Sequence, residues 1–316
     1  MSYTAAAHAA VGEGAAEGDM QLPCPPHHMR NVLTGECIKV EGAESIVIPA
    51  GRVQGKDFLK DHIAKFYTKV MLYYMDKYQD MATILPYYMV SPHPYFYALR
   101  WKYTGKPSES PATASFVPAT ARRRWQMLAP PVFSTFMDNA MANPAIKTIV
   151  LVISIDGMTP KWRHSNAVFI HKGQRFIERF EPNTVAEKPR GNVYLGNGEQ
   201  LDEALKELFA KWTEGYEYVP PMLTCPLGFH AVDCLEREES TKDKGGNCTD
   251  WSLWWMDLRL ANADRPREEL IGYAIEELRR GGSFRHFING YIDFLTRISK
   301  KYKGSQRAII AKREVC

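Results

Sequence analysis

The sequence predicts an α+β fold for the C-terminal half of the chain. Residues 147–180 contain apolar, β-branched runs that are typical of buried strands. Residues 201–302 contain four segments in which apolar side chains recur at helical spacing. Strands followed by helices, without an internal repeat, favour α+β over an alternating α/β architecture.

Length and charge limit the classes of function. The 316 residues suffice for one large or two modest domains, and the net charge of +4 is too small to indicate a nucleic-acid partner. No apolar run has the length of a membrane span. Residues 1–19 are rich in Ala and Gly and predict a disordered tail rather than a secretion signal, and residues 304–316 predict a basic tail.

Residues 20–50 form a small unit with two cysteines. Because the sequence shows no secretion signal, we expect the six cysteines of the chain to be mostly reduced thiols, including Cys24 and Cys37. A zinc site made by these cysteines with His27 and His28 is an alternative, although the spacing fits no standard finger. We expect the protein to function without a metal ion.

Residues 51–145 predict a helical, aromatic-rich region. A long helical pattern runs from residue 55 to residue 81, and a short helix is expected at residues 134–142. Between them, residues 104–121 are rich in Pro, Ser and Thr, which predicts a loop and a domain boundary.

Three strands follow, at residues 147–155, 165–170 and 175–180, with a tight turn at residues 171–174. His164 precedes the second of these strands and Glu181 ends the third. Because a hairpin brings the start of one strand beside the end of the next, His164 and Glu181 are expected to be near cross-strand neighbours.

The remaining elements are mainly helices. An amphipathic helix is expected at residues 201–212, short strands within residues 216–232, and a largely buried helix at residues 249–260. Pro266 near a first turn and Gly281-Gly282 at the end bound the next helix. Ser283 is a suitable N-cap for the last helix, up to residue 302.

Cys248 stands at a predicted helix start, after Gly245 and Gly246. The orphan N–H groups and the dipole of a helix N-terminus favour a thiolate, whereas a carboxylate at Asp250 disfavours it. With His164 as base and Glu181 as its orienting group, Cys248 makes a candidate nucleophile. Taken singly, each residue has a structural alternative: a buried thiol, a hydrogen-bonded histidine and an ordinary carboxylate.

Residues 145–300 resemble the Ulp1/adenain-like cysteine proteases, which include proteases specific for SUMO and other ubiquitin-like proteins. The resemblance lies in RHSNAVFI around His164, ERFEPN around Glu181 and GGNCTDWSLWWMDLRLAN around Cys248. It implies a protease domain at residues 146–303, with a central mixed sheet packed on helices and the nucleophile at the start of the central helix. Residues 20–50 are similar to a two-cysteine adaptor found in proteins of large DNA viruses.

Two departures from the family pattern concern the substrate site. The family has a glutamine before the cysteine as an oxyanion donor, and here the candidates are His230 and Asn247. The family often has Trp after the histidine, where this chain has Ser165. The expected substrate groove comprises Trp162, Ser165, Gly245, Gly246 and Trp251.

The resemblance implies a thiol protease that needs no cofactor and acts in the host cytoplasm or the virion. Its substrate would be a protein with an extended tail, either a viral structural precursor or a ubiquitin-like conjugate. Residues 20–50 would contact other virion proteins. The alternative function is a virion scaffold that keeps the protease fold without turnover, which the missing glutamine motivates.

Overall fold

The computed structural model describes residues 23–31, 34–51, 63–83, 98–103, 125–131, 133–156, 163–182, 198–221 and 248–301. It confirms the predicted α+β class. The strands are β1 (His28–Arg30), β2 (Cys37–Lys39), β3 (Met81–Ala82), β4 (Leu99–Tyr103), β5 (Trp125–Leu128), β6 (Thr148–Asp156), β7 (Arg163–His171), β8 (Phe176–Phe180) and β9 (Glu217–Val219). The helices are α1 (Ile63–Lys77), α2 (Phe133–Ala142), α3 (Gly198–Phe209), α5 (Cys248–Ala261), α6 (Arg267–Arg280) and α7 (Phe284–Lys301), with a 3-10 turn at Ala43–Ser45.

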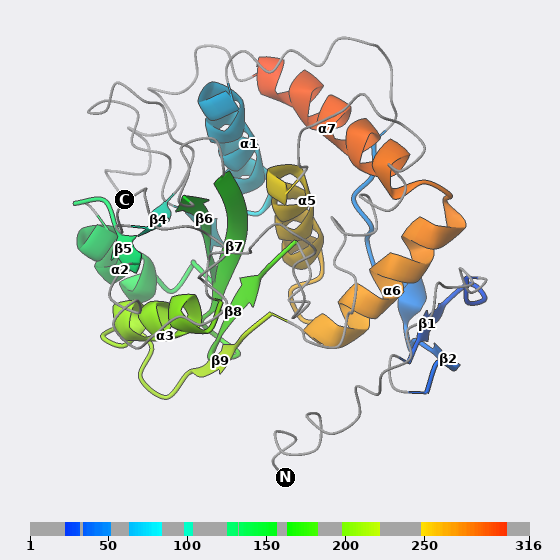
Figure 1. The fold of residues 1–316 in the computed structure, drawn as a ribbon, viewed down its shortest axis with the longest axis horizontal. Helices are drawn as coiled ribbons and strands as arrows, with labels where there is room; N and C mark the ends of the chain where they lie inside the picture. The colour runs from blue at the N-terminus through cyan, green and yellow to red at the C-terminus, as the bar shows by residue number, and fades with distance from the viewer. Residues whose placement is uncertain are drawn as a thin grey trace, which may run out of the picture.

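A mixed sheet forms the centre of the molecule (Figure 1). Its strand order is β5-β4-β6-β7-β8-β9, and β3 also pairs with β6. The β6–β7 and β7–β8 pairs are antiparallel, as the hairpin pattern predicts. The β4–β6 and β8–β9 pairs are parallel. Strands from distant parts of the sequence therefore pair with the two outer edges of the consecutive strands β6, β7 and β8.

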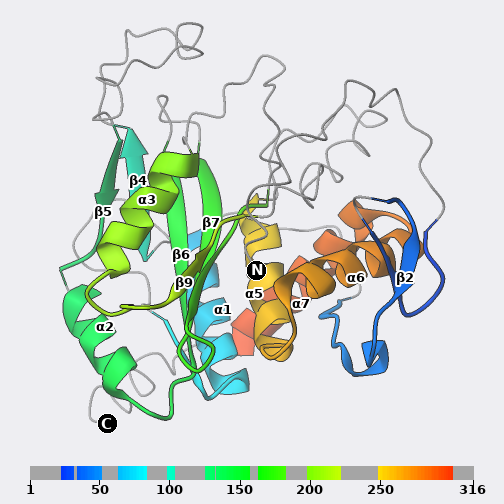
Figure 2. The same ribbon diagram turned by 90° about the horizontal axis from the view of Figure 1, so that it is seen from below.

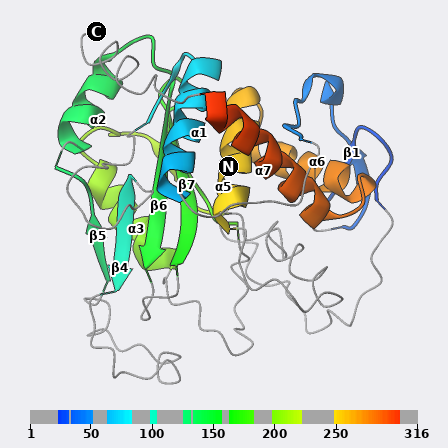
Figure 3. The ribbon, with the colours of Figure 1, turned by 90° about the horizontal axis from the view of Figure 1, so that it is seen from above.

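Helices cover both faces of the sheet. Helices α2 and α3 lie on one face, while α1 and α5 lie on the other, with α6 and α7 beyond them (Figures 2 and 3). Alternation along β6 separates two cores, because Val150 and Val152 face α5 whereas Ile149 and Leu151 face α2 and α3. Helix α5 is buried from Trp251 to Arg259, since β7 packs on one side and α7 on another.

The N-terminal two-cysteine unit packs on α6, and its two cysteines depart from the expectation of mostly reduced thiols. Cys24 and Cys37 form a disulfide, which also excludes these two sulfurs as zinc ligands. The backbone N–H of Cys24 donates to the buried carboxylate of Glu276 on α6 at 2.8 Å, and Arg280 donates to the Cys24 carbonyl. A disulfide suits a unit this small, because thirteen positions of chain cannot bury a core of their own.

Other element boundaries shift for identifiable reasons. The predicted helix up to residue 81 ends at Lys77, because Met81–Ala82 instead pair with β6 as β3. Strands β4 and β5 were not predicted, and they add part of region 51–145 to the main sheet. Ser283 caps α7, accepting a hydrogen bond from the backbone N–H of His286 at 3.1 Å. The predicted segments 1–19, 104–121 and 304–316 lie outside the described residues.

None of the described helices combines the length and the apolar character needed to cross a bilayer.

Candidate active site

Cys248 is the first residue of α5, and two hydrogen bonds fix this end of the helix against β7. The hydroxyl groups of Ser165 and Thr249 lie 2.9 Å apart, and the Ser252 hydroxyl donates to the Ser165 carbonyl at 3.2 Å. Because both contacts fall within the first two turns, the α5 N-terminus is held beside His164, which precedes Ser165 in the chain.

His164 and Glu181 are in direct contact. The last β7–β8 pair is Ala167 with Phe180, so the strand register places Glu181 opposite Asn166 and diagonal to His164. The Nε2 atom of His164 lies 2.5 Å from Oε1 of Glu181, and both side chains are almost fully buried. The hairpin therefore delivers the pair that the sequence predicts.

The thiol of Cys248 also forms a hydrogen bond with the His164 ring. Since Glu181 occupies Nε2, Nδ1 is the ring nitrogen available to the sulfur. Cys248 is buried, with 9% of the whole residue exposed.

Electrostatics favour a thiolate–imidazolium pair. Burial opposes both charges, but the Glu181 carboxylate and the Cys248 sulfur raise the pKa of His164 to about 10. For Cys248, burial raises the pKa, yet the charge and hydrogen bond of His164 and a backbone hydrogen bond from Ser165 hold the pKa below its ordinary value. Asp250 opposes this effect. His164 and Cys248 thus each favour the charged state of the other.

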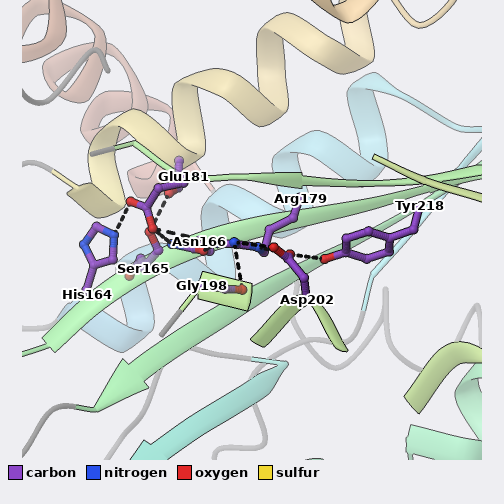
Figure 4. A network of polar contacts seen from close by, with 9 residues as sticks. His164, Ser165, Asn166, Arg179, Glu181, Gly198, Asp202 and Tyr218 are labelled. Carbon is purple, nitrogen blue, oxygen red and sulfur yellow. Dashed lines mark hydrogen bonds and ion pairs between the residues drawn. The ribbon is translucent and has the colours of Figure 1, made fainter. Parts of the chain in front are cut away.

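A chain of polar contacts supports Glu181 through its second carboxylate oxygen, Oε2 (Figure 4). Asn166 donates through Nδ2 to Oε2 of Glu181 at 2.9 Å, and Arg179 donates to Asn166. Asp202 of α3 and Tyr218 of β9 follow. Sequence reasoning missed these four residues. Asn166 and Arg179 could have been found from the sequence, because each is a polar residue inside a strand that is buried.

Helix α1 also reaches the site. The phenol of Tyr67 is buried beside the first turn of α5, where it forms hydrogen bonds with Thr249 and Asp250. Burial, followed by the negative charge of Asp250, raises the pKa of Tyr67 well above its ordinary value, so this phenol stays neutral. Region 51–145 therefore contributes a residue to the support of the cysteine.

The predicted groove residues have different outcomes. Ser165 lies at the site through its bond to Thr249. Trp251 does not line a groove, because its side chain is 0% exposed and packs in the core between α5 and α7. Trp162, Gly245, Gly246 and the oxyanion candidates His230 and Asn247 lie outside the described residues.

Within the described ranges, no group of three or more His, Cys, Asp or Glu side chains is placed to hold a metal ion.

Comparison with known proteins gives limited sequence similarity. No family model matches the chain. A curated mimivirus protein, "Putative ankyrin repeat protein L371" of Acanthamoeba polyphaga mimivirus, is 27% identical over 193 residues. The match covers 56% of this chain and 24% of that protein, so the chain spans only about a quarter of its relative's length.

Three solved structures are similar over most of the chain. The SUMO protease Ulp1 has a TM-score of 0.32 and 12% identity, covering 86% of this chain and 90% of its own. ChlaDub1 from Chlamydia trachomatis has a TM-score of 0.38 and 9% identity, covering 80% and 97%. The Legionella pneumophila effector RavZ has a TM-score of 0.32 and 10% identity, covering 80% and 71%. These scores are low, so inferences about activity depend on the geometry of this chain.

Proposed function

We propose that the chain is a cysteine peptidase in which Cys248, His164 and Glu181 act as nucleophile, base and orienting carboxylate. The observation that carries the proposal is the continuous contact from the Cys248 sulfur through the His164 ring to Glu181, at the N-terminus of a helix. The charge and hydrogen bond of His164 offset the burial that raises the Cys248 pKa.

The chemistry follows from the two ring nitrogens. The thiolate of Cys248 attacks a substrate carbonyl carbon, forming an S–C bond, while the backbone N–H of Cys248 is an orphan donor at the helix start that can bind the oxyanion. The Nδ1 proton of His164 passes to the leaving nitrogen as the C–N bond breaks. Water then gives a proton to Nδ1, its hydroxyl attacks the thioester, and the thiolate is released.

Burial of the site indicates an extended substrate. Because Cys248 and His164 are both buried, an extended chain suits the site better than the surface of a folded protein. We propose a peptide or isopeptide bond near such a tail, in a viral structural precursor or a ubiquitin-like conjugate. The mimivirus relative supports a viral setting.

A peptide-library digestion tests the peptidase assignment. The protein is incubated with denatured proteome-derived peptides and with ubiquitin- and SUMO-vinyl-sulfone probes, and new N-termini and adducts are identified by mass spectrometry. Cleavage or a single adduct on Cys248, lost in both Cys248→Ser and His164→Ala, is expected. Neither cleavage nor adduct with the wild-type chain would favour the scaffold function instead.

A further inference from the structure

Both carboxylate oxygens of Glu181 make polar contacts. The second one connects to a buried relay, which consists of Asn166, Arg179, Asp202 and Tyr218. Oε1 contacts His164, while Oε2 accepts from Asn166 at 2.9 Å (Figure 4). Asn166 is 0% exposed, so its amide is not a solvated surface group. The residues that contact the other end of the Asn166 amide therefore determine how Glu181 is held.

Arg179 fixes the direction of the Asn166 amide. Nη1 of Arg179 lies 2.6 Å from Oδ1 of Asn166. A guanidinium group only donates hydrogen bonds, so the amide oxygen of Asn166 must face Arg179 and its NH₂ group must face Glu181. Nη1 also lies 3.9 Å from Oε2 of Glu181, which brings a permanent positive charge to the carboxylate.

Asp202 and Tyr218 hold Arg179 in place from two other elements. Asp202 of α3 binds the guanidinium with two contacts, Nε to Oδ1 at 2.6 Å and Nη2 to Oδ2 at 3.0 Å. The Tyr218 hydroxyl of β9 donates to Oδ1 of Asp202 at 2.5 Å. Such a two-point pair fixes orientation as well as charge.

The relay matters because the charge on His164 changes during the proposed reaction. When the imidazolium gives up its Nδ1 proton, Glu181 is left as a buried carboxylate beside a neutral ring, a costly state without another positive group. In the imidazolium state, the short contact to Nε2 would also let Glu181 take the Nε2 proton, which would leave a neutral ring protonated only at Nδ1. Arg179 and Asn166 stabilise the ionised carboxylate in both states of His164.

We propose that Asn166, Arg179 and Asp202 are positioning residues that keep Glu181 ionised, so that the shared proton stays on Nε2 while Nδ1 exchanges protons with Cys248 and the leaving group. This inference rests on the proposed function, since it concerns the same histidine. It assigns α3, through Asp202, a part in the proton transfer.

The test is the double variant Arg179→Met/Asp202→Leu. Replacing both partners with apolar side chains leaves neither buried charge unpaired. A matched control is Arg259→Met/Glu178→Leu, which removes an ion pair of 3.1 Å whose side chains are each 1% exposed. Glu178 neighbours Arg179 on β8 but faces the other side of the sheet, so the control carries the structural cost without touching the relay.

The readout is the pH profile of Cys248 alkylation by iodoacetamide, followed by mass spectrometry. At pH 6 we expect alkylation about tenfold slower in the relay variant than in the wild type, because one unit of thiol pKa is a tenfold change in thiolate. The control variant should stay within about twofold. An unchanged profile in the relay variant, or an equal shift in both variants, overturns the inference.

A second measurement needs no variant beyond an assignment control. In the ¹⁵N-histidine-labelled full chain, the Nε2 resonance of His164, assigned through its loss in His164→Gln, should report a protonated nitrogen from pH 5 to pH 9. An unprotonated Nε2 in that range means that Glu181 has taken the proton, which overturns the relay's role. If wild-type Cys248 alkylates as an ordinary thiol, the proposed function itself fails, and this outcome is distinguishable from both others.

Discussion

Nε2 of His164 lies 2.5 Å from Oε1 of Glu181, across seventeen positions of chain. One hairpin makes this contact, and its charge has a direct consequence for the histidine. Burial lowers the pKa of His164, but Glu181 and the Cys248 sulfur together raise it to about 10.

Glu181→Gln is therefore expected to reduce peptidase kcat by ~100-fold or more, within the range of general acid–base catalysis. The amide retains a hydrogen bond but loses the charge that stabilises the imidazolium. Steady-state kinetics on a cleaved peptide measure the effect. Glu276→Gln, which neutralises an equally buried carboxylate on α6, is the control, and an equal loss in both variants would rule out a specific role for Glu181.

Asp250→Asn should have the opposite effect on the cysteine. The carboxylate of Asp250 opposes the lowering of the Cys248 pKa, so its neutralisation should move the midpoint of Cys248 alkylation to lower pH, by less than about one unit. The same change should cost about 0.5 kcal/mol of stability, because a negative side chain near a helix N-terminus is favourable. A midpoint that rises would contradict this account of the first turn.

His171 predicts acid sensitivity of the fold. Burial, and then the positive charge of Arg259, lower the pKa of His171 to about 3, against about 6.5 when unfolded. Between these two pKa values the unfolded chain binds a proton at His171 and the folded chain does not. Stability therefore falls as pH drops from about 6.5 towards 3, by about 1.4 kcal/mol per pH unit.

His171→Phe tests this linkage. The ring of His171 lies against Phe176 in a tilted arrangement with centroids 4.2 Å apart, so a phenyl ring suits the position and cannot take up a proton. Urea unfolding at pH 7 and pH 5 should show a smaller acid loss in the variant, by about 2 kcal/mol. Equal losses in both proteins would show that His171 is protonated in the folded state.

The Cys24–Cys37 disulfide predicts a redox effect confined to one region. Reduction, or the Cys24→Ala/Cys37→Ala variant, should weaken the two-cysteine unit by up to about 3 kcal/mol, because the disulfide closes a loop of thirteen positions. Hydrogen exchange should increase in β1, which lies against α6, and in β2, and should remain unchanged in β6 and β7. Faster exchange throughout the sheet would mean that the unit supports the whole fold.

Local patterns predicted the hairpin and the helices well. The β-branched run of β6 and the turn before β8 specify their pairing within a few dozen residues, so register and the His164–Glu181 contact follow from short-range rules. Cys248 at the start of α5 was also readable, from two glycines before an apolar helix.

Long-range partners were not predictable in this way. The pairing of β4 with β6 joins segments about fifty positions apart. The sequence of Leu99–Tyr103 does not indicate which strand it pairs with. Trp251 could belong to a groove or a core on its pattern alone, and only packing against α7 decides. The disulfide was missed because redox state was inferred from the absence of a signal rather than from geometry.

The pH dependence of Cys248 alkylation, compared between the wild type and His164→Ala, tests the central claim most directly. The thiolate–imidazolium pair predicts fast alkylation that begins well below the ordinary thiol pKa of about 8.5. In His164→Ala the onset should move up to that value or beyond, because His164 then no longer offsets the burial that raises the Cys248 pKa. Superimposable profiles in the two proteins would contradict the account, since Cys248 would then be a buried thiol that His164 does not activate.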